Sequence, residues 1–424
     1  MKLPESLLIA LSLSYGVLSA PTPGQPQLNG RSFKVERVRR GAGTIHGPTA
    51  LRRAYEKFGI VPMDLGIDLD DFVPISKHAA LQQDVAEPDQ TGAVSAASVQ
   101  NDAAFVSPVK IGGQQIVLNF DTGSSDFWVL NSRLPKLDTR GRTVYNPSNS
   151  STFKQMKGST FNITYGDTSF AYGGVGTDVV DVGGVTVQDQ AIGIPTTVSS
   201  SFLEDTYSNG IVGLAFSKLN TISPNQQKTF FDNVAPILDE PVLTASLKSD
   251  GVGEYEFGVI DHDKYQGDLA NITIDSSSGF WEFVSASFSV GGGALQDVRD
   301  VRRSIADTGT SLMLLDQSVV DAYYKQVQGA VYVSSASGYI YPCSAVLPNL
   351  TMAVGEKHYA TVPGEYMNFS EIGTNKTTGE TVCYGGVQSN QGTSMQIFGD
   401  VFLKAFFTVF DLRGPSLGLA SPNF

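Results

Sequence analysis

The chain has 424 residues, of which 17% are charged and 44 are glycine, and it carries a net charge of −13. This length predicts two or three domains with a large core, and the composition excludes an intrinsically disordered chain. Abundant glycine with few charged residues is typical of short strands joined by many turns.

Residues 1–20 have the pattern of a secretory signal. Lys2 precedes a mostly apolar stretch over 7–18, and Ser19-Ala20 then leads into a Pro-rich segment. The stretch is too short for a secure membrane span, and the C-terminus lacks the apolar tail of a lipid-anchor signal. A buried N-terminal helix is the alternative. We therefore expect a secreted protein without a membrane anchor, with delivery to an acidic vacuole as the second possibility.

Residues 21–95 are predicted to form a propeptide. The stretch 21–60 holds eight basic and two acidic side chains, whereas 61–90 holds one basic and seven acidic side chains. These two blocks cancel, so the net negative charge falls on residues 91–424. A basic stretch ahead of an acidic domain can dock on it electrostatically. A solvated linker and a nucleic-acid-binding arm are the alternatives, and the arm fits a secreted acidic protein poorly.

A helix is predicted within this propeptide over residues 49–58. Leu51, Tyr55 and Phe58 fall on one face, Thr49 is placed to cap the start, and Gly59 is placed to end the helix. Such a pattern favours a folded prosegment over a tail. The small residues from Gly92 to Val99 then form a plausible cleavage region.

From about residue 103 the chain is predicted to be mostly β. Apolar and polar residues alternate, with Gly or Asn turns between the segments. The clearest helix is expected over Asp316–Gln328, with Gly329 as its stop. The alternating segments are Val106 to Phe120, Phe161 to Tyr165, Val175 to Val187, Glu254 to Ile260 and Phe283 to Val290.

The tripeptide Asp-Thr-Gly occurs twice, at residues 121–123 and 307–309. Each copy follows an apolar run and precedes a pair of Ser or Thr residues. Two copies in matching contexts indicate two similar halves that each bring one carboxylate, Asp121 and Asp307, to a shared place.

Two carboxylates that lie a hydrogen bond apart cannot both ionise easily, so the pair carries one proton over an acidic pH range. Such a pair can take a proton from water while it donates one to a carbonyl oxygen, which is acid–base hydrolysis of an amide without a covalent intermediate. The glycines allow a tight turn with N–H groups aimed at each carboxylate, and Ser124 and Thr310 can donate further hydrogen bonds.

On these motifs, residues from about 100 onward resemble the pepsin-family aspartic endopeptidases, most closely the secreted fungal aspergillopepsin and penicillopepsin types. The motifs are 120–129 and 305–311 around the two aspartates, with a later apolar-apolar-Gly signature in each half at 210–214 and 396–400. The resemblance implies a bilobal, mostly β double-barrel fold with the active-site cleft between two pseudo-symmetric lobes. It places the N-terminal lobe at 96–270 and the C-terminal lobe at 271–424, behind the prosegment.

The resemblance also implies roles for individual residues. Asp121 and Asp307 are the expected catalytic pair that activates water. Tyr165 is expected on a flap that closes over the substrate, with its hydroxyl bonded to the Trp128 indole, and Asp167 matches a flap acid of fungal members that accept Lys before the cut. The other implied substrate-binding residues are Gly166, Gly123, Gly309 and Thr310, and the supporting ones are Thr122, Ser124, Trp128 and Thr308.

A prosegment that fills the cleft at neutral pH and leaves in acid is a further implication. In related zymogens a lysine often pairs with the catalytic carboxylates, and Lys57 is the candidate here. An ordinary exposed lysine is the alternative. Acid is expected to weaken the attraction between a basic prosegment and an acidic enzyme by protonating carboxylates.

Cys343 and Cys383 are the only cysteines. In an oxidising compartment they are expected to form one disulfide, with two free buried thiols as the alternative, and two cysteines without matching histidines do not make a zinc site. They also match the single C-terminal disulfide of the fungal family members. Glycan attachment is predicted at six Asn-x-Ser/Thr sequons: Asn149, Asn162, Asn271, Asn349, Asn368 and Asn375.

Other functions fit the sequence less well. The Gly-x-Ser-x-Gly at 414–418 leaves only six residues for the Asp and His of a serine hydrolase, and the four histidines fit no triad or metal spacing. A catalytically inactive, protein-binding relative and a structural glycoprotein are the rivals from other classes. We expect a monomer that acts on polypeptide substrates, is inhibited by its own propeptide, needs no metal or cofactor and binds no nucleic acid.

Overall fold

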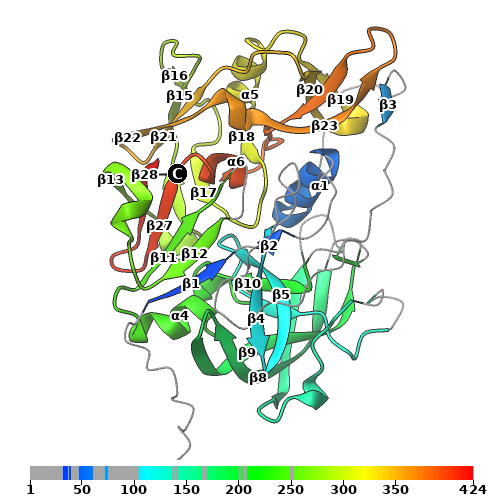
Figure 1. Ribbon diagram of the computed structural model, residues 1–424, viewed down its shortest axis with the longest axis vertical. Coiled ribbons are helices and arrows are strands. Elements are labelled where there is room, and N and C mark those ends of the chain that lie inside the picture. Colours follow the sequence, from blue (N-terminus) through cyan, green and yellow to red (C-terminus); the bar gives the residue numbers. More distant parts are fainter. Residues whose placement is uncertain are drawn as a thin grey trace, which may run out of the picture.

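The computed structural model describes residues 32–36, 38–39, 47–60, 72–74, 105–135, 139, 142–164, 170–199, 202–203, 208–248 and 253–423. The protein is mostly β, as predicted, and Figure 1 shows two lobes with helix α1 (Gly47–Phe58) between them. The predicted signal at 1–20 and the flap residues 165–167 lie outside the described residues.

The N-terminal lobe contains one eight-stranded sheet in the order β2-β4-β5-β10-β6-β9-β8-β7. Two of the predicted alternating segments each contain a hairpin turn, at 112–113 and 183–184, where two consecutive glycines with positive φ reverse the chain. The strands are β2 (Val38–Arg39), β4 (Phe105–Ile111), β5 (Gln114–Asp121), β6 (Phe127–Val129), β7 (Lys154–Thr164), β8 (Phe170–Val182), β9 (Val185–Val198) and β10 (Gly210–Gly213).

The C-terminal lobe contains three smaller sheets, ordered β14-β17-β26-β18-β25, β16-β15-β21-β22 and β19-β20-β24-β23-β3. The predicted strand over 283–290 is two strands, because the chain leaves one sheet after Val284 and enters another at Ser287. The strands are β3 (Phe72–Pro74), β14 (Glu282–Val284), β15 (Ser287–Val290), β16 (Gln296–Asp297), β17 (Arg303–Ala306), β18 (Met313–Leu315), β19 (Val331–Val333), β20 (Gly338–Pro342), β21 (Leu350–Val354), β22 (His358–Val362), β23 (Asn368–Asn375), β24 (Thr381–Gly385), β25 (Val387–Ser389) and β26 (Gln396–Phe398).

A six-stranded sheet, in the order β1-β12-β11-β27-β28-β13, combines strands that are far apart in sequence. It thereby connects the two halves of the chain. The predicted lobe boundary at 270/271 falls inside β13, and the division into lobes at that residue stays a prediction. The strands are β1 (Phe33–Glu36), β11 (Val242–Ser246), β12 (Glu254–Phe257), β13 (Tyr265–Thr273), β27 (Phe407–Asp411) and β28 (Ser416–Pro422).

The same strand arrangement occurs once in each lobe. Strand β10 runs parallel to β5 and antiparallel to β6. In the other lobe β26 runs parallel to β17 and antiparallel to β18. The repeated apolar-apolar-Gly signatures thus form equivalent central strands behind the two Asp-Thr-Gly loops, which is the internal repeat that the sequence predicts.

Helix α1 begins two residues before its predicted start, so Thr49 lies inside the helix and does not cap it. The Gly47 amide instead donates to Ser370 Oγ at 3.1 Å. The end is as predicted: Gly59 has a φ of +73°, and the Ile60 amide donates to the Tyr55 carbonyl at 2.9 Å. Leu51 and Tyr55 are buried, so the predicted apolar face is in contact with the rest of the protein.

The predicted helix over 316–328 is shorter in the structure, where α5 spans Gln317–Tyr324. Asp316 caps its start by accepting from the Ser318 amide. The Lys325 amide still donates four residues back, whereas the Gln326 and Val327 amides donate three residues back, which tightens the chain before Gly329. The other α-helices of the described segments are α4 (Phe230–Val234) and α6 (Asp400–Leu403). None of the described helices is long and apolar enough to cross a membrane.

The expected disulfide is confirmed between Cys343 and Cys383. It links the end of β20 to the neighbouring strand β24, within one C-terminal sheet. One large cluster of buried apolar side chains extends through both lobes and includes residues of α1 and β1. The buried residues of α1 and β1 therefore share one core with the rest of the protein.

Asp126 is a buried carboxyl on the loop that follows Asp121, and it is 4% exposed. Its oxygens accept from the Thr221 amide and hydroxyl at 3.0 and 3.1 Å and from Asn220 Nδ2 at 3.2 Å. Burial raises the pKa of Asp126 to about 6, although the hydrogen bonds from Thr221 oppose this shift. Asp126 therefore fastens the Asp121 loop to residues 220–221 at an electrostatic cost when it is ionised.

We predict that the Asp126→Asn variant is more stable than the wild type at neutral pH. A carboxyl whose pKa is raised from 3.8 to about 6 on folding binds more protons in the folded state, so folding stability falls as the pH rises between these values. The loss is about 3 kcal/mol above pH 6. Urea unfolding of both proteins at pH 4 and pH 7 measures this loss.

The exposed variant Asp189→Asn serves as the control and should leave the pH profile unchanged. If Asp126→Asn loses as much folding stability as the wild type between pH 4 and pH 7, ionisation of Asp126 is not the cause of the loss.

Candidate active site

The two predicted catalytic carboxylates meet between the lobes. Asp121 is the last residue of β5, and Asp307 directly follows β17, the equivalent strand of the other lobe. Asp121 is 2% exposed and Asp307 is fully buried. The central strands fix both positions, because the Leu214 amide donates to the Asp121 carbonyl at 2.7 Å and the Asp307 amide donates to the Phe398 carbonyl at 3.1 Å.

Lys57, at the end of α1, contacts both carboxylates. Its Nζ donates to Asp121 Oδ1 at 2.6 Å and to Asp307 Oδ1 and Oδ2 at 2.8 Å. Only 11% of the Lys57 side chain is exposed. The alternative of an ordinary exposed lysine is therefore wrong, and a single ammonium group links α1 to both halves of the protein.

Each carboxylate is also bonded within its own loop. The Gly123 amide donates to Asp121 Oδ1 at 2.9 Å, and the Gly309 amide donates to Asp307 Oδ1 at 2.9 Å. The hydroxyls three positions after each aspartate complete the pattern: Ser124 to Asp121 Oδ2 at 2.6 Å, and Thr310 to Asp307 Oδ2 at 2.5 Å. These donors stabilise the charged form of each carboxylate and hold it in place.

Glycine is required in both loops because the opposite carboxylate lies too close for a side chain. A Cβ at position 123 would lie 2.5 Å from Asp307 Oδ1, and a Cβ at position 309 would lie 2.3 Å from Asp121 Oδ1. The Asp-Thr-Gly motif thus uses glycine to let two loops from different lobes approach each other.

Thr122 and Thr308 connect the two loops by a symmetric set of hydrogen bonds. Thr122 Oγ1 donates to the Ala306 carbonyl at 3.0 Å and accepts from the Thr308 amide at 3.0 Å. Thr308 Oγ1 donates to the Phe120 carbonyl at 2.8 Å and accepts from the Thr122 amide at 3.1 Å. These four bonds cross between the lobes and set the separation of the two carboxylates.

The site pushes the two pKa values apart. Burial raises the pKa of Asp307 to about 6, helped by the charge of Asp121 and opposed by Lys57. Burial also acts on Asp121, but Lys57 and hydrogen bonds from Asp307 and Ser124 hold its pKa below the usual value. Burial alone would lower the pKa of Lys57, and the two carboxylates raise it instead. The pair can therefore hold one proton over an acidic range.

Trp128, the predicted partner of the flap tyrosine, is a buried residue of β6 that packs edge-on against Phe202. Its indole Nε1 has no hydrogen-bond partner among the residues that the structure describes. The flap residues Tyr165, Gly166 and Asp167 lie outside those residues, so the predicted bond between Tyr165 and Trp128 stays a prediction.

Besides Lys57, a second polar side chain of α1 bonds to the rest of the protein, and sequence reasoning did not identify it. The buried Tyr55 hydroxyl donates to the carbonyl of Ser389, at the end of β25, at 2.7 Å. Tyr55 was expected only as part of an apolar face. The hydrogen bond depends on a backbone carbonyl 334 residues away in the chain, and no local pattern points to such a partner.

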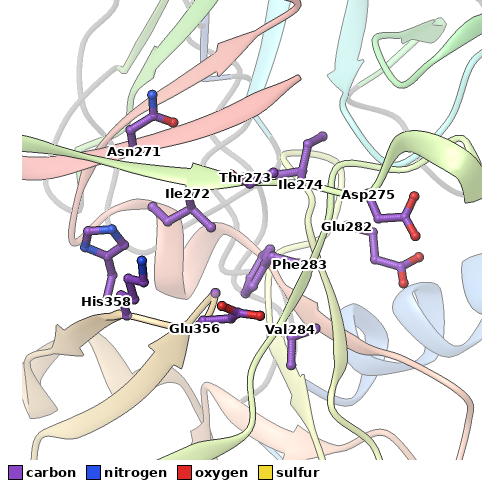
Figure 2. Close-up of a pocket in the computed structure, with 12 residues that line it drawn as sticks. Asn271, Ile272, Thr273, Ile274, Asp275, Glu282, Phe283, Val284, Glu356 and His358 are labelled. Carbon is purple, nitrogen blue, oxygen red and sulfur yellow. The ribbon is translucent and has the colours of Figure 1, made fainter. Parts of the chain in front are cut away.

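A separate cavity of about 440 Å³ lies away from the two aspartates, between β13, β14 and the turn from β21 to β22. Figure 2 shows Ile272 and Phe283 facing its interior and His358 at its edge. Glu282, on another wall, is paired with Arg303 at 2.7 Å. None of the predicted catalytic, substrate-binding or supporting residues lines this cavity, although Asn271, a predicted glycan site, does.

The comparison with known proteins agrees with this geometry. A family model described as eukaryotic aspartyl protease matches residues 104–422. A protein of Aspergillus fumigatus described as aspergillopepsin A-like is 69% identical over 99% of both chains. An aspartic protease, PEP3, of Coccidioides posadasii is 48% identical over 97% of this chain and 93% of its own length, and aspergillopepsin-1 of Aspergillus oryzae is 41% identical over 98% of both. The chain therefore belongs to the eukaryotic aspartyl proteases of the pepsin family, as an aspergillopepsin-like aspartic-type endopeptidase.

Proposed function

We propose that this protein is a secreted zymogen whose mature form hydrolyses polypeptides at acidic pH between Asp121 and Asp307. The observation that carries the proposal is the contact of one ammonium group, Lys57 Nζ, with both carboxylates. A basic helix that covers the reacting groups explains how an enzyme of this family stays latent. The pattern at residues 1–20 supports secretion.

In the mature enzyme the dyad shares one proton. The ionised carboxylate takes a proton from a water molecule as its oxygen attacks the peptide carbonyl, while the protonated carboxyl donates its proton to the carbonyl oxygen. The carboxyl that took the water proton then gives it to the leaving amine as the C–N bond breaks, and the other carboxylate takes a hydroxyl proton from the tetrahedral intermediate, so the pair again holds one proton. The donors at Gly123, Ser124, Gly309 and Thr310 hold the carboxylates in place, so little reorganisation is needed during the reaction.

Substrate selection is assigned to the flap and the apolar surroundings of the site. We infer that Tyr165, with Gly166, closes over the substrate and that its hydroxyl accepts from Trp128, whose buried N–H needs a partner. Bulky hydrophobic residues are expected on both sides of the cut. Asp167 is expected to allow Lys before the cut, and the six sequons are expected glycan sites. We further propose that the mature enzyme acts as a monomer.

We predict that replacing either aspartate abolishes catalysis without unfolding the protein. Asp121→Asn and Asp307→Asn each remove one proton-transfer group, so kcat should fall by about 10³-fold or more. Cleavage of a denatured protein at acidic pH, with variants processed in trans by immobilised wild-type enzyme, measures this loss.

The wild-type assay also tests the alternative of an inactive relative. Cleavage by the acid-treated wild type should be blocked by pepstatin, a transition-state-like inhibitor of the family. If the acid-treated wild type shows no pepstatin-sensitive cleavage, the protein is not an active protease and the inactive, protein-binding alternative is preferred.

The ion pairs of Lys57 are expected to respond to acid in two steps. Burial raises the pKa of Asp307 to about 6, so its protonation below that pH would remove one of the two charges that attract Lys57. Asp121 keeps its charge until the solution is more acidic, because Lys57 and hydrogen bonds hold its pKa below the usual value of an aspartate. A lowered pKa contributes stability above the unfolded value and loses it as the pH falls through the folded value. We therefore expect release to begin near pH 6 and to be complete only below the usual pKa of an aspartate.

We predict that Lys57→Gln makes the precursor active at pH 6.5, where the wild type stays latent. Removing one partner of a buried ion pair costs about 3–5 kcal/mol, so the open population should rise by at least about 100-fold. Hydrolysis of a short fluorogenic peptide at pH 6.5, without prior acid treatment, measures this population.

Lys110→Gln, which removes an exposed lysine of β4, is the charge-matched control and should stay latent. A Lys57→Gln precursor that is as latent as the wild type at pH 6.5 would show that Tyr55 and the strands of the prosegment hold it closed without the ion pairs.

A further inference from the structure

A segment of the prosegment extends a sheet of the C-terminal lobe. Strand β3 pairs antiparallel with β23, with Phe72 opposite Asn375, Val73 opposite Thr374 and Pro74 opposite Gly373. In this sheet β24 lies on the other side of β23. Figure 1 shows β3 at the outer side of β23, apart from α1. Without β3, the edge of β23 would expose unpaired backbone groups.

The direction of these groups follows from the hairpin between β23 and β24. The Asn375 amide donates to the Glu380 carbonyl at 2.9 Å, and the Gly379 amide donates to the Asn375 carbonyl at 2.9 Å. Because backbone groups alternate in direction along a strand, the amide and carbonyl of Thr374 point away from β24 and toward β3. Thr374 is therefore the position at which an added strand gains its hydrogen bonds.

Strand β23 also borders the place where α1 lies. Ser370, near its start, accepts from the Gly47 amide at the beginning of α1, and Lys57 at the other end of α1 contacts the dyad. Ten residues of helix span about 15 Å, and four residues of strand span about 13 Å. The Lys57 and Ser370 side chains and their hydrogen bonds add about 15 Å, so Thr374 lies within about 43 Å of the dyad, a distance that about 13 extended residues can cover.

We propose that, in the mature enzyme, the edge of β23 at residues 372–374 is an exosite that binds an extended segment of the polypeptide substrate as an added strand. In the precursor β3 occupies this edge, as α1 occupies the site of cleavage. The inference rests on the proposed function, because the edge opens only when the prosegment leaves.

The edge of β23 would form hydrogen bonds with the backbone of the substrate, since the groups that Thr374 offers are an amide and a carbonyl. Such an exosite accepts many sequences and requires only that the substrate be unfolded and long. It therefore favours unfolded polypeptides over short peptides that end before they reach Thr374.

The experiment compares two substrates of the mature enzyme. One is an octapeptide, and the other places the same octapeptide in the middle of an unstructured chain of about 40 residues. Thr374→Pro removes the outward amide while the bonds of Asn375 to the hairpin remain. Loss of this bond should lower kcat/KM for the long substrate by about fivefold, through KM, and leave the octapeptide unaffected. Thr374→Val keeps the amide and is the matched control.

A second measurement uses the wild-type enzyme and does not depend on the folding of a variant. A peptide of residues 70–76 should slow cleavage of the long substrate but not of the octapeptide. The same peptide with an N-methyl group on the Val73 amide should lose this effect. The exosite is refuted if Thr374→Pro and the peptide affect both substrates equally or affect neither. If the wild type cleaves neither substrate, the proposed protease function itself fails.

Discussion

The structure depends on bringing two buried carboxylates of like charge to one place. Asp121 and Asp307 are almost fully buried, and burial alone disfavours ionisation of both. The protein offsets this cost with two loop donors for each carboxylate, with a proton shared by the pair and, in this form, with the ammonium of Lys57. The same concentrated negative charge that requires these donors also attracts the ammonium of Lys57.

The repeated strand arrangement makes this approach possible. In each lobe a central strand, β10 or β26, lies between the two strands that flank the Asp-Thr-Gly loop. It supports the loop from behind. Thr122 and Thr308 then join the loops by equivalent bonds, and the glycines leave room for the opposite carboxylate. A change in one loop therefore alters the geometry of the other, although 186 residues separate them.

The described residues between positions 32 and 74 contact all the main parts of the molecule. Strand β1 joins the sheet that connects the two halves, and β2 joins the N-terminal sheet. Strand β3 joins a C-terminal sheet, and α1 lies between the lobes with Lys57 on the dyad. Lys34 on β1 is paired with Glu254, a carboxylate whose pKa is lowered in spite of burial because Lys264 and Lys34 bond to it. Basic residues of the stretch 21–60 thus pair with particular carboxylates, in addition to the general attraction between a basic stretch and an acidic domain.

The sequence alone determined the family, the mostly β architecture, the disulfide and the residues of the Asp-Thr-Gly loops. These features follow from local patterns: alternation marks strands, paired glycines mark hairpin turns, and a repeated motif marks two equivalent loops. Gly59 was recognised as the end of α1 for the same reason, since a helix stop is a local signal. The start of α1 was misplaced, and the helix at 317–324 was predicted too long, because those ends depend on bonds and turns formed in the folded chain.

Only the tertiary structure decided which partners distant residues find. Resemblance made Lys57 the candidate partner of the dyad, with an ordinary exposed lysine as the alternative, and only the folded chain decides between the two by placing its ammonium between two buried carboxylates. Tyr55 bonds a carbonyl 334 residues away, Asp126 becomes a buried acid against Thr221, and β3 finds the edge of β23. The physical reason is that hydrogen bonds and ion pairs gain their strength from burial, and burial is a property of the assembled core that a local sequence pattern does not contain.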